Sequence, residues 1–501
     1  MDILQWILLP FTDIKILLLT ALGAFAGVIL GAIPGLSVTM AVALLLSLTF
    51  SWDLYPALAL MIGVYFGGVF GGSRPAILMN IPGGSSNVAT SFDGYPLAKR
   101  GEAKLALSLT TIFSGIGGLI GIIVLATAAP IVANIAIKFS PRDFFLVAML
   151  GLLLVGSLSK GSLAKGIFTA GLGVLLGLVG MDPLDGSQRF TFGQLSLMNG
   201  VNFIVALLGL FGMSEVLYQL KGLHIQGTLA KFNKTVTAPV ISYVLKFLPL
   251  SIRTSVLGIL VGALPGVGAD IAALLAYDHA KSTVKKPSRP FGKGSYEGVV
   301  APESANNAAL MGALIPMLTL GIPGDSVTAI FVGALTIQGL NPGPLLMVNN
   351  PDIFWVIVGI SIVATIFIVI FGLSIVRIFM RIVVTPKQIL LPIIAVISVV
   401  GTYAINNSLV DVYWMMFFAV IGLFLKINNF SVGPMVLGII LGPIVEINFR
   451  RAYIAADSNP IEFITSFFTS PISLVLTIFF LVTAFIQTPW YAQLKAKLKK
   501  A

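Results

Sequence analysis

The chain has 501 residues, of which 57% are hydrophobic and only 10% are charged, and its mean hydropathy is +1.02. This composition excludes a soluble domain, which needs far more polar surface to cover its core. The chain has no cysteine and only two histidines, which excludes thiol catalysis, a disulfide framework and a Cys/His zinc site. The net charge of +11 comes from basic residues in short loops beside apolar runs, which is typical of membrane topology and not of a nucleic-acid partner.

The first predicted elements are a hairpin of two apolar segments and an interrupted span. The hairpin covers residues 14–50 and has Gly31-Ala-Ile-Pro-Gly35 at its tip, and the span over 56–92 is interrupted at Asn80-Ile-Pro-Gly-Gly-Ser85. Pro-Gly pairs break a helix, and a membrane tolerates broken backbone only where protein or a polar cavity surrounds it. This pattern favours a transporter or a channel over a passive anchor. Uninterrupted spans follow at 105–128, 143–158, 163–180 and 201–218.

The same series of elements recurs in the second half of the chain. A hairpin over 252–280 has Gly262-Ala-Leu-Pro-Gly266 at its tip, and a span over 297–340 is interrupted at Gly321-Ile-Pro-Gly-Asp-Ser326. A tandem duplication is the simplest explanation for two motifs in the same order. Further spans are predicted at 353–376, 389–404, 410–425, 432–446 and 471–488. We therefore divide the chain into a first repeat, a cytoplasmic linker, a second repeat, and a last span with a basic tail, at 1–220, 221–250, 251–450 and 451–501.

Loop charges predict that the two repeats have opposite orientations. Loop 93–104 carries Lys99, Arg100 and Lys104, whereas its counterpart 341–352 has no Lys or Arg. By the positive-inside rule, equivalent loops then face opposite sides of the membrane. Asp93 and Glu102 flank these basic residues and are expected to be loop charges. Basic residues that this trace places outside weaken it without overturning it: Lys138, Arg142, Arg189, Arg450 and Arg451.

The predicted fold is an all-α polytopic membrane protein with two inverted-topology repeats, about 11 or 12 transmembrane spans and a cytoplasmic C-terminus. Each repeat contributes a re-entrant Pro-Gly hairpin and a discontinuous helix. Secondary transporters place their binding sites where such broken helices of inverted repeats meet. We therefore expect an elevator-type secondary transporter, in which the hairpins move against the uninterrupted spans. The alternative is an ion or solute channel with a pore lined by broken helices.

The breaks supply the candidate binding groups. The N–H groups at a new helix N-terminus carry partial positive charge and bind carboxylates. Substrate contacts are predicted at Gly35, Ser37, Thr39, Arg74, Gly83, Gly84, Ser85, Ser86, Asn87, Pro265, Gly266, Gly268, Asn306, Asn307, Gly324, Ser326 and Thr328. The hydroxyl groups among these could instead bond backbone or a neighbouring helix. Arg74 could snorkel at a helix end or pair with an internal acid, and Asn306 and Asn307 could cap the helix that follows. Asp270 and Asp325 are predicted to couple a cation, with Na⁺ near both, or to have a structural hydrogen-bonding role.

The motifs resemble those of the large membrane subunit of tripartite tricarboxylate transporters (TctA-like). The resemblance rests on Gly31-Ala-Ile-Pro-Gly35, Asn80-Ile-Pro-Gly-Gly-Ser-Ser-Asn87, Phe92-Asp-Gly-Tyr-Pro96, Gly262-Ala-Leu-Pro-Gly-Val-Gly-Ala-Asp270, Ala301-Pro-Glu-Ser-Ala-Asn-Asn307 and Gly321-Ile-Pro-Gly-Asp-Ser326. It implies a multi-pass permease of the bacterial inner membrane for citrate-like tricarboxylates or related organic acids. It also implies a periplasmic solute-binding protein and a small membrane subunit as partners, and Na⁺ or H⁺ as the coupling ion in place of a cofactor. The sequence leaves the oligomeric state open.

Catalytic signatures are missing from the sequence. It contains no His-Glu-x-x-His or Gly-x-Ser-x-Gly motif, which argues against an intramembrane enzyme. It also lacks the Gly-x-x-x-x-Gly-Lys-Ser/Thr phosphate loop of ATP-driven pumps, which agrees with transport driven by an ion gradient. We therefore expect a transporter and not an enzyme.

Overall fold

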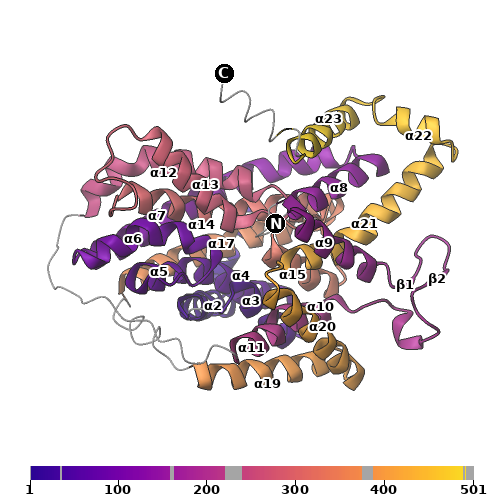
Figure 1. The fold of residues 1–501 in the computed structure, drawn as a ribbon, viewed down its shortest axis with the longest axis horizontal. Helices are drawn as coiled ribbons and strands as arrows, with labels where there is room; N and C mark the ends of the chain where they lie inside the picture. The colour runs from indigo at the N-terminus through magenta and orange to yellow at the C-terminus, as the bar shows by residue number, and fades with distance from the viewer. Residues whose placement is uncertain are drawn as a thin grey trace. The chain divides into compact units, whose positions relative to one another are not determined.

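The computed structural model describes residues 2–33, 36–157, 163–220, 240–374, 387–488 and 491 (Figure 1). Within these residues the chain is helical apart from one two-stranded hairpin. Seven described helices are long and apolar enough to cross a membrane, or eight if one bent pair counts as a single span. The prediction of an all-α polytopic membrane protein is confirmed at this level. The chain forms two compact units, Met1–Ile131 with Ile204–Phe424 and Val132–Phe203 with Leu425–Ala501.

The first unit begins with the elements of the first hairpin and the first interrupted span. Its helices in chain order are α1 (Ile3–Thr12), α2 (Ile14–Ala32), α3 (Val38–Thr49), α4 (Leu54–Gly71), α5 (Ser73–Met79), the 3-10 helix η1 (Ser85–Asn87), α6 (Val88–Lys99) and α7 (Ala103–Ala136). Side chains define the hairpin helices locally: Asp13 accepts the Lys15 N–H at 2.8 Å where α2 starts, and Ser37 accepts the Met40 N–H at 3.1 Å where α3 starts. Such capping satisfies backbone groups that a helix terminus leaves unpaired.

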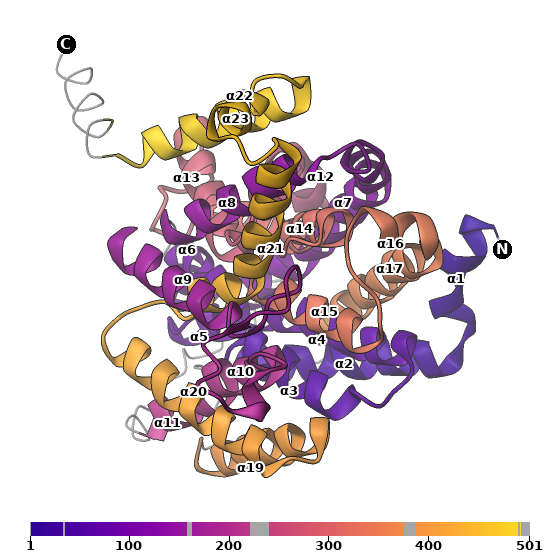
Figure 2. The same ribbon diagram turned by 90° about the vertical axis from the view of Figure 1, so that its right-hand side faces the viewer.

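The later elements of this unit comprise the last helices of the first half and the helices of the second half. They are α10 (Phe203–Leu207), the π-helix η3 (Leu208–Met213), α11 (Ser214–Gln219), α12 (Val240–Gly262), α13 (Gly268–Thr283), α14 (Glu297–Leu320), α15 (Ser326–Ile337), α16 (Pro344–Asn349), α17 (Pro351–Ser374), α19 (Lys387–Asn406) and α20 (Leu409–Ile427). Helix α12 begins inside the range predicted as a linker, and residues 221–239 of that range lie outside the described part of the chain. Figure 2, which is turned by 90° from Figure 1, labels α15, α16 and α17.

The two halves make the same helix contacts. Helix α2 packs on α4, and α12 packs on α14. At the first contact, a Cβ on Gly31 would overlap the carbonyl group of Gly68, and at the second a Cβ on Gly262 would overlap that of Ala309. Glycine is needed at both positions because the neighbouring backbone leaves no room for a side chain, which is how small residues bring membrane helices close together.

The two helix breaks also have matching backbone geometry. Helix α5 ends at Asn80 with φ 56°, and α14 ends at Gly321 with φ 72°. In each, the N–H of the isoleucine that follows donates to the carbonyl of an earlier proline, at 3.3 Å and 3.2 Å. A left-handed residue followed by such a bond ends a helix and satisfies its last carbonyl groups. The two halves therefore break their helices in the same way, whereas their opposite orientation in a membrane stays a prediction.

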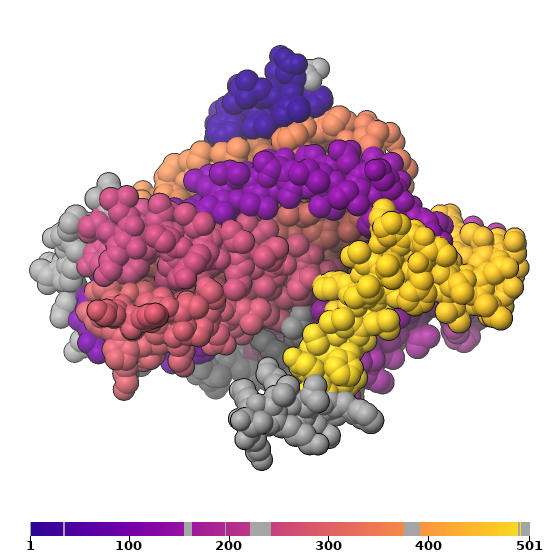
Figure 3. All heavy atoms as spheres, turned by 90° about the horizontal axis from the view of Figure 1, so that it is seen from above, coloured from indigo at the N-terminus to yellow at the C-terminus, as the bar shows by residue number. Residues whose placement is uncertain are grey.

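The second unit consists of apolar helices that pack on one another and a short strand hairpin. Its elements are α8 (Pro141–Ser157), α9 (Leu163–Gly177), β1 (Gly180–Met181), β2 (Gln188–Arg189), the 3-10 helix η2 (Leu195–Leu197), α21 (Gly433–Ala455), α22 (Pro460–Ser466) and α23 (Pro471–Ile486). Helices α8 and α9 pack on α21, and α23 packs on α8. The strands are antiparallel, with Gly180 opposite Arg189. The C-terminal helices α22 and α23 are yellow in Figure 3.

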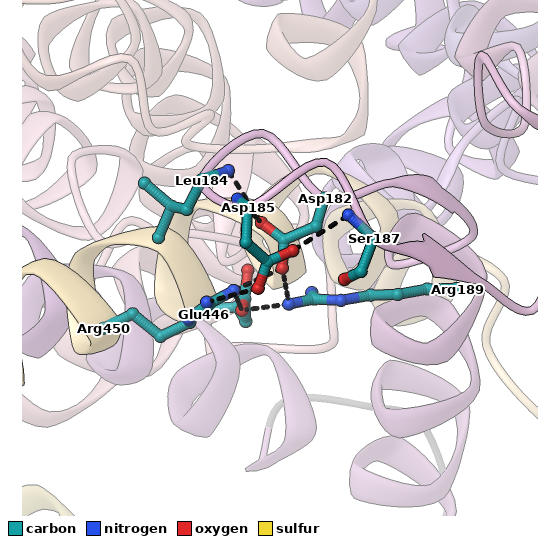
Figure 4. Close-up of polar contacts among 7 residues, drawn as sticks. All are labelled: Asp182, Leu184, Asp185, Ser187, Arg189, Glu446 and Arg450. Atoms are coloured by element: carbon teal, nitrogen blue, oxygen red, sulfur yellow. Dashed lines mark hydrogen bonds and ion pairs between the residues drawn. The ribbon is translucent and has the colours of Figure 1, made fainter.

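An ion-pair cluster connects the β1–β2 hairpin to α21 (Figure 4). Asp182 contacts the guanidinium groups of both Arg189 and Arg450. Arg450 also binds Asp185 at 2.8 Å, and Arg189 binds Glu446 at 2.9 Å. Two of the basic residues that counted against the predicted topology are therefore paired with acids. Neighbouring opposite charges support one another in such a cluster more than in isolated surface pairs.

The predicted spans coincide with observed helices. The ranges 105–128, 143–158, 163–180 and 201–218 correspond to α7, α8, α9 and α10–α11, and the later ranges correspond to α17, α19, α20, α21 and α23. The sequence analysis missed α1, α16, α22 and the strand pair. These elements are short, and an apolar run of fewer than about 18 residues is a weak membrane signal.

Candidate functional site

The breaks of the two halves lie close together within the first unit. Helix α13, which follows the second hairpin tip, packs against η1, which follows the interruption of the first interrupted span. Asn306 of α14 donates to the carbonyl oxygen of Ser86 at 3.4 Å. A Cβ on Gly268 would lie 2.8 Å from the Cβ of Asp325, so the second hairpin tip also touches the break before α15. Groups from three breaks therefore share one region.

Asp325 is the N-cap of α15. Its Oδ1 accepts the N–H groups of Val327 and Thr328 at 3.0 Å and 2.7 Å, and the Thr328 hydroxyl bonds back to complete a capping box. A carboxylate at this position is favoured by the helix dipole. Asp325 therefore has the structural hydrogen-bonding role that was the alternative to cation coupling. Its second oxygen, Oδ2, accepts the hydroxyl of Tyr65 at 2.5 Å.

Tyr65 is a site residue that the sequence analysis missed. It lies on α4, is buried, and contacts Phe331 of α15 edge to face at 5.9 Å between ring centroids. Asp270, an exposed residue in the first turn of α13, also interacts electrostatically with Tyr65. The Tyr65 hydroxyl therefore hydrogen-bonds to one of the two carboxylates predicted to couple a cation and interacts electrostatically with the other. A tyrosine in the middle of an apolar helix was the available signal, because a buried hydroxyl usually needs a partner.

The remaining predicted contacts are distributed around these breaks. Ser86, Asn87, Gly83, Pro265, Gly268, Gly324 and Thr328 are buried, and Ser37, Thr39, Gly84, Ser85, Gly266 and Ser326 are partly exposed. Asn87 donates to the Val69 carbonyl at 2.9 Å, which fixes η1 against α4. Gly35 lies outside the described residues. The structure brings the described candidates into one unit, and their contact with a substrate stays a prediction.

Arg74 lies inside the helix bundle. Its exposed fraction is 1%, and its guanidinium carbon is 3.4 Å from the centroid of the Phe70 ring. The guanidinium donates to the Phe70 carbonyl at 2.9 Å and to the hydroxyls of Ser73 and Thr111, each at 2.8 Å. Hydrogen bonds of this kind are what a buried charge requires. Among the described residues Arg74 forms no ion pair with an acid, so the expected internal acid is replaced by a carbonyl and two hydroxyls, and contact of Arg74 with a substrate stays a prediction.

Glu303 is a second buried ionisable residue of the first unit. It lies on α14 with an exposed fraction of 0%, and it accepts the hydroxyls of Thr90 at 2.6 Å and Ser114 at 2.9 Å. Its partners come from α6 and α7, so this carboxylate joins helices of the two halves. On the same helix, Asn307 donates to the Asn306 side chain at 2.7 Å. Buried polar networks of this kind favour one packing arrangement over others.

The expectation that Asp93 is a charge of the loop 93–104 is wrong. Asp93 lies in α6 with an exposed fraction of 0%. Its Oδ1 accepts three backbone N–H groups of residues 292–295 at 2.8 to 2.9 Å, and Oδ2 accepts the Tyr277 hydroxyl at 2.9 Å. Glu102, just before α7, pairs with Arg289 at 2.7 Å. The two acids therefore hold the α13–α14 connection of the second half on the first half.

Comparisons with known proteins agree with the motifs. The tripartite tricarboxylate transporter TctA family matches residues 17–437. An uncharacterized 52.8 kDa protein in the TAR-I ttuC' 3' region of Agrobacterium vitis is 36% identical over 455 residues, which cover 89% of this chain and 88% of that protein. An uncharacterized protein in the TAR-II ttuC' 3' region of the same organism is 37% identical over 209 residues, 42% of this chain and 86% of that protein. No solved structure matches the chain.

Proposed function

The chain belongs to the tripartite tricarboxylate transporter TctA family, and from this membership we propose that it is a cation-coupled secondary transporter that imports citrate-like tricarboxylates or related organic acids. Membership in this family implies a component of a tripartite transporter, and a transporter rather than an enzyme. The long apolar helices imply a multi-pass membrane protein. The observation that supports a transport site is the meeting of broken helices from both halves around Asp325 and Tyr65.

In this proposal the substrate carboxylates bind at the helix starts that follow the breaks. The N–H groups at the start of η1 provide partial positive charge, and Ser85, Ser86 and Ser326 provide hydroxyl donors. At the start of α15, the Val327 and Thr328 N–H groups already donate to Asp325. Binding of this kind suits a carboxylate, since it needs no cationic side chain. Asp270, Asp325 and the Tyr65 hydroxyl form the cation site, where Na⁺ or a proton would neutralise charge near the bound anion.

We propose an elevator motion for transport. One support is that the α2–α4 and α12–α14 contacts are equivalent. A second is that Asp93 of α6, and Glu102 in the turn after it, bind the α13–α14 loop. A body that carries both hairpins and both breaks would move as one against the uninterrupted spans. The repeats would have inverted topology in the bacterial inner membrane, with a cytoplasmic C-terminus. Structures trapped facing each side would contradict this if the hairpins kept the same depth in the membrane.

A periplasmic solute-binding protein and a small membrane subunit complete the proposed system. Both follow from membership in a tripartite family. Co-purification with a binding protein would identify the system, and the ligand of that protein would identify the substrate. Saturable counterflow in proteoliposomes is expected from a carrier, whereas conductance far above carrier turnover would favour a channel.

The test of the cation site is substitution of Asp325 by Asn. Asn keeps an acceptor for the α15 N–H groups but removes the charge, so we expect the helix cap to persist and the stimulation of citrate uptake by a Na⁺ or H⁺ gradient to be lost. Counterflow without a gradient should be retained. The assay uses proteoliposomes with the solute-binding protein of the system outside.

The chain offers a matched control for this variant. Asp352 accepts the hydroxyl of Tyr55 in the same way that Asp325 accepts Tyr65, but it lies at the start of α17, away from the breaks. Asp352→Asn should leave gradient stimulation unchanged, and Tyr65→Phe should weaken it. Equal gradient dependence in Asp325→Asn and wild type would refute the coupling role.

A further inference from the structure

A cavity of about 240 Å³ opens in the second unit. It lies between the start of α8, the end of α21, and α22 with the turn that leads to α23. Its polar lining consists of Ser140, Arg142, Glu462, Thr465, Ser466 and Thr469. Apolar helices begin and end here, and the ends of membrane spans lie at the depth of lipid headgroups.

Arg142 is positioned to bind an anion in this cavity. Its Nε donates to the Ser473 hydroxyl at 2.9 Å, and that hydroxyl donates to Asp143 at 2.5 Å. Within the described residues, this is the one hydrogen bond of the Arg142 side chain, so the two terminal nitrogens are available for a ligand. A guanidinium fork held at Nε presents two parallel N–H donors, which is the arrangement that phosphate oxygens match best.

The other side of the cavity is suited to a cation. Glu462 lines it with an exposed carboxylate, which accepts the Asn459 side-chain amide at 3.4 Å and forms no ion pair with Arg142 among the described residues. The hydroxyls of Thr465, Ser466 and Thr469 each donate to a nearby backbone carbonyl. Their oxygens are therefore left as acceptors, which suit the N–H donors of an ammonium group. Opposite charges that are separated within one cavity match a zwitterion.

Helix α22 and the turn after it also expose apolar side chains that do not line the cavity. Ile461 and Ile464 of α22 are 73% and 59% exposed, and Phe468 in the turn that follows is 55% exposed. Helix α22 lies at 92° to α23. A short helix that turns apolar side chains outward, across the direction of a span, is typical of the membrane–water interface. These exposed apolar side chains of α22 would contact acyl chains while the polar cavity holds a headgroup.

We propose that this cavity binds a phospholipid with a zwitterionic phosphoethanolamine headgroup. The phosphate contacts the Arg142 fork, and the primary ammonium contacts Glu462 and the threonine and serine oxygens. Phosphatidylcholine carries the same charges but has no N–H donor, so it should bind more weakly. Phosphatidylglycerol has no cationic group for Glu462 and should also bind more weakly.

The test measures lipid binding to the purified full-length chain by native mass spectrometry and by the unfolding temperature after delipidation. Phosphatidylethanolamine should bind about tenfold more tightly than phosphatidylcholine, as expected for one hydrogen bond to a charged group. Glu462→Gln should remove this preference, and Arg142→Gln should weaken binding of all three lipids. Because Glu462 is exposed, its variant keeps the fold even if Arg142→Gln does not.

Two control variants remove nearby exposed charges that do not line the cavity. Arg451→Gln and Asp457→Asn should leave lipid preference unchanged. Equal affinity of wild type for phosphatidylethanolamine and phosphatidylcholine would overturn the proposal, as would a wild-type preference that persists in Glu462→Gln. Soluble glycerophosphoethanolamine distinguishes the source: if it binds as tightly as the lipid, the ligand is a free headgroup and the lipid assignment is wrong.

Discussion

The close backbone approach at the breaks predicts a large effect of a single methyl group at Gly324. A Cβ there would lie 2.5 Å from the Cα of Ala313 and 2.8 Å from the carbonyl oxygen of Gly262. Both are backbone atoms and cannot move aside as a side chain could. Overpacking of this kind typically costs about 1–3 kcal/mol, and the lower chain entropy of Ala offsets about 0.4–1 kcal/mol of it. We therefore expect Gly324→Ala to lower the free energy of unfolding by about 1–2 kcal/mol.

The equivalent glycine of the first half makes this a test of the repeat. A Cβ on Gly83 would lie 2.6 Å from the Cα of Gly72 and would overlap the carbonyl oxygen of Gly31. Since the two sites have the same geometry, Gly83→Ala should destabilise the chain by a similar amount. Citrate uptake should fall in both variants, because the breaks hold the proposed site.

The assay is unfolding in detergent micelles, followed by the fluorescence of the five tryptophans. The matched control is Gly171→Ala on α9, where nothing lies within 4 Å of an added Cβ. Ala is a better helix former than Gly by about 0.5–1 kcal/mol, so the control should unfold no earlier than wild type. Wild-type stability of Gly324→Ala and Gly83→Ala would refute the close approach. Destabilisation of one but not the other would refute the equivalence of the breaks.

Three further predictions concern buried or clustered charges. Arg74→Gln removes the hydrogen bonds of the guanidinium to the Phe70 carbonyl and to Thr111 and should cost about 1–3 kcal/mol in unfolding free energy; because the Arg74 charge also interacts with that of Glu303, the double variant with Glu303→Gln should cost less than the sum of the two single losses, and additive losses would contradict this coupling. Asp93→Ala leaves three backbone N–H groups without their acceptor, so hydrogen exchange in residues 292–295 should accelerate; unchanged exchange would show that the loop is held by other contacts. Burial raises the pKa of the Asp182 carboxyl, but hydrogen bonds from the Leu184 N–H and from Arg450 outweigh it, and hydrogen bonds from Ser187 lower the pKa of Asp185. Both folded-state pKa values lie below the unfolded value, so the contribution of these carboxylates to hairpin stability is present above about pH 4. That contribution is lost as the pH falls through the folded pKa values. Pepsin cleavage within 180–189 should therefore increase only at strongly acid pH.

The positions of the helices and of their breaks were predictable because their signals are local. An apolar run long enough to cross a bilayer identifies its own helix, so the predicted span 353–376 agrees with α17. A Pro-Gly pair ends a helix wherever it stands, so the interruptions after Asn80 and Gly321 appear at the expected residues. The duplication was visible for the same reason, since each copy keeps its own motif. The family resemblance rested on these motifs as well.

The partners of charged and hydroxyl side chains depended on the tertiary structure. Asp93 stood beside basic residues in the sequence and was expected in a loop, but its acceptors face the backbone of residues 292–295, far away in the chain. Tyr65 looked like one more apolar position of a span until α4 brought its hydroxyl against Asp325. Local pattern determines which segments become helices because burial in lipid depends on composition alone. Which polar groups meet is decided by packing between segments, and no local pattern carries that information.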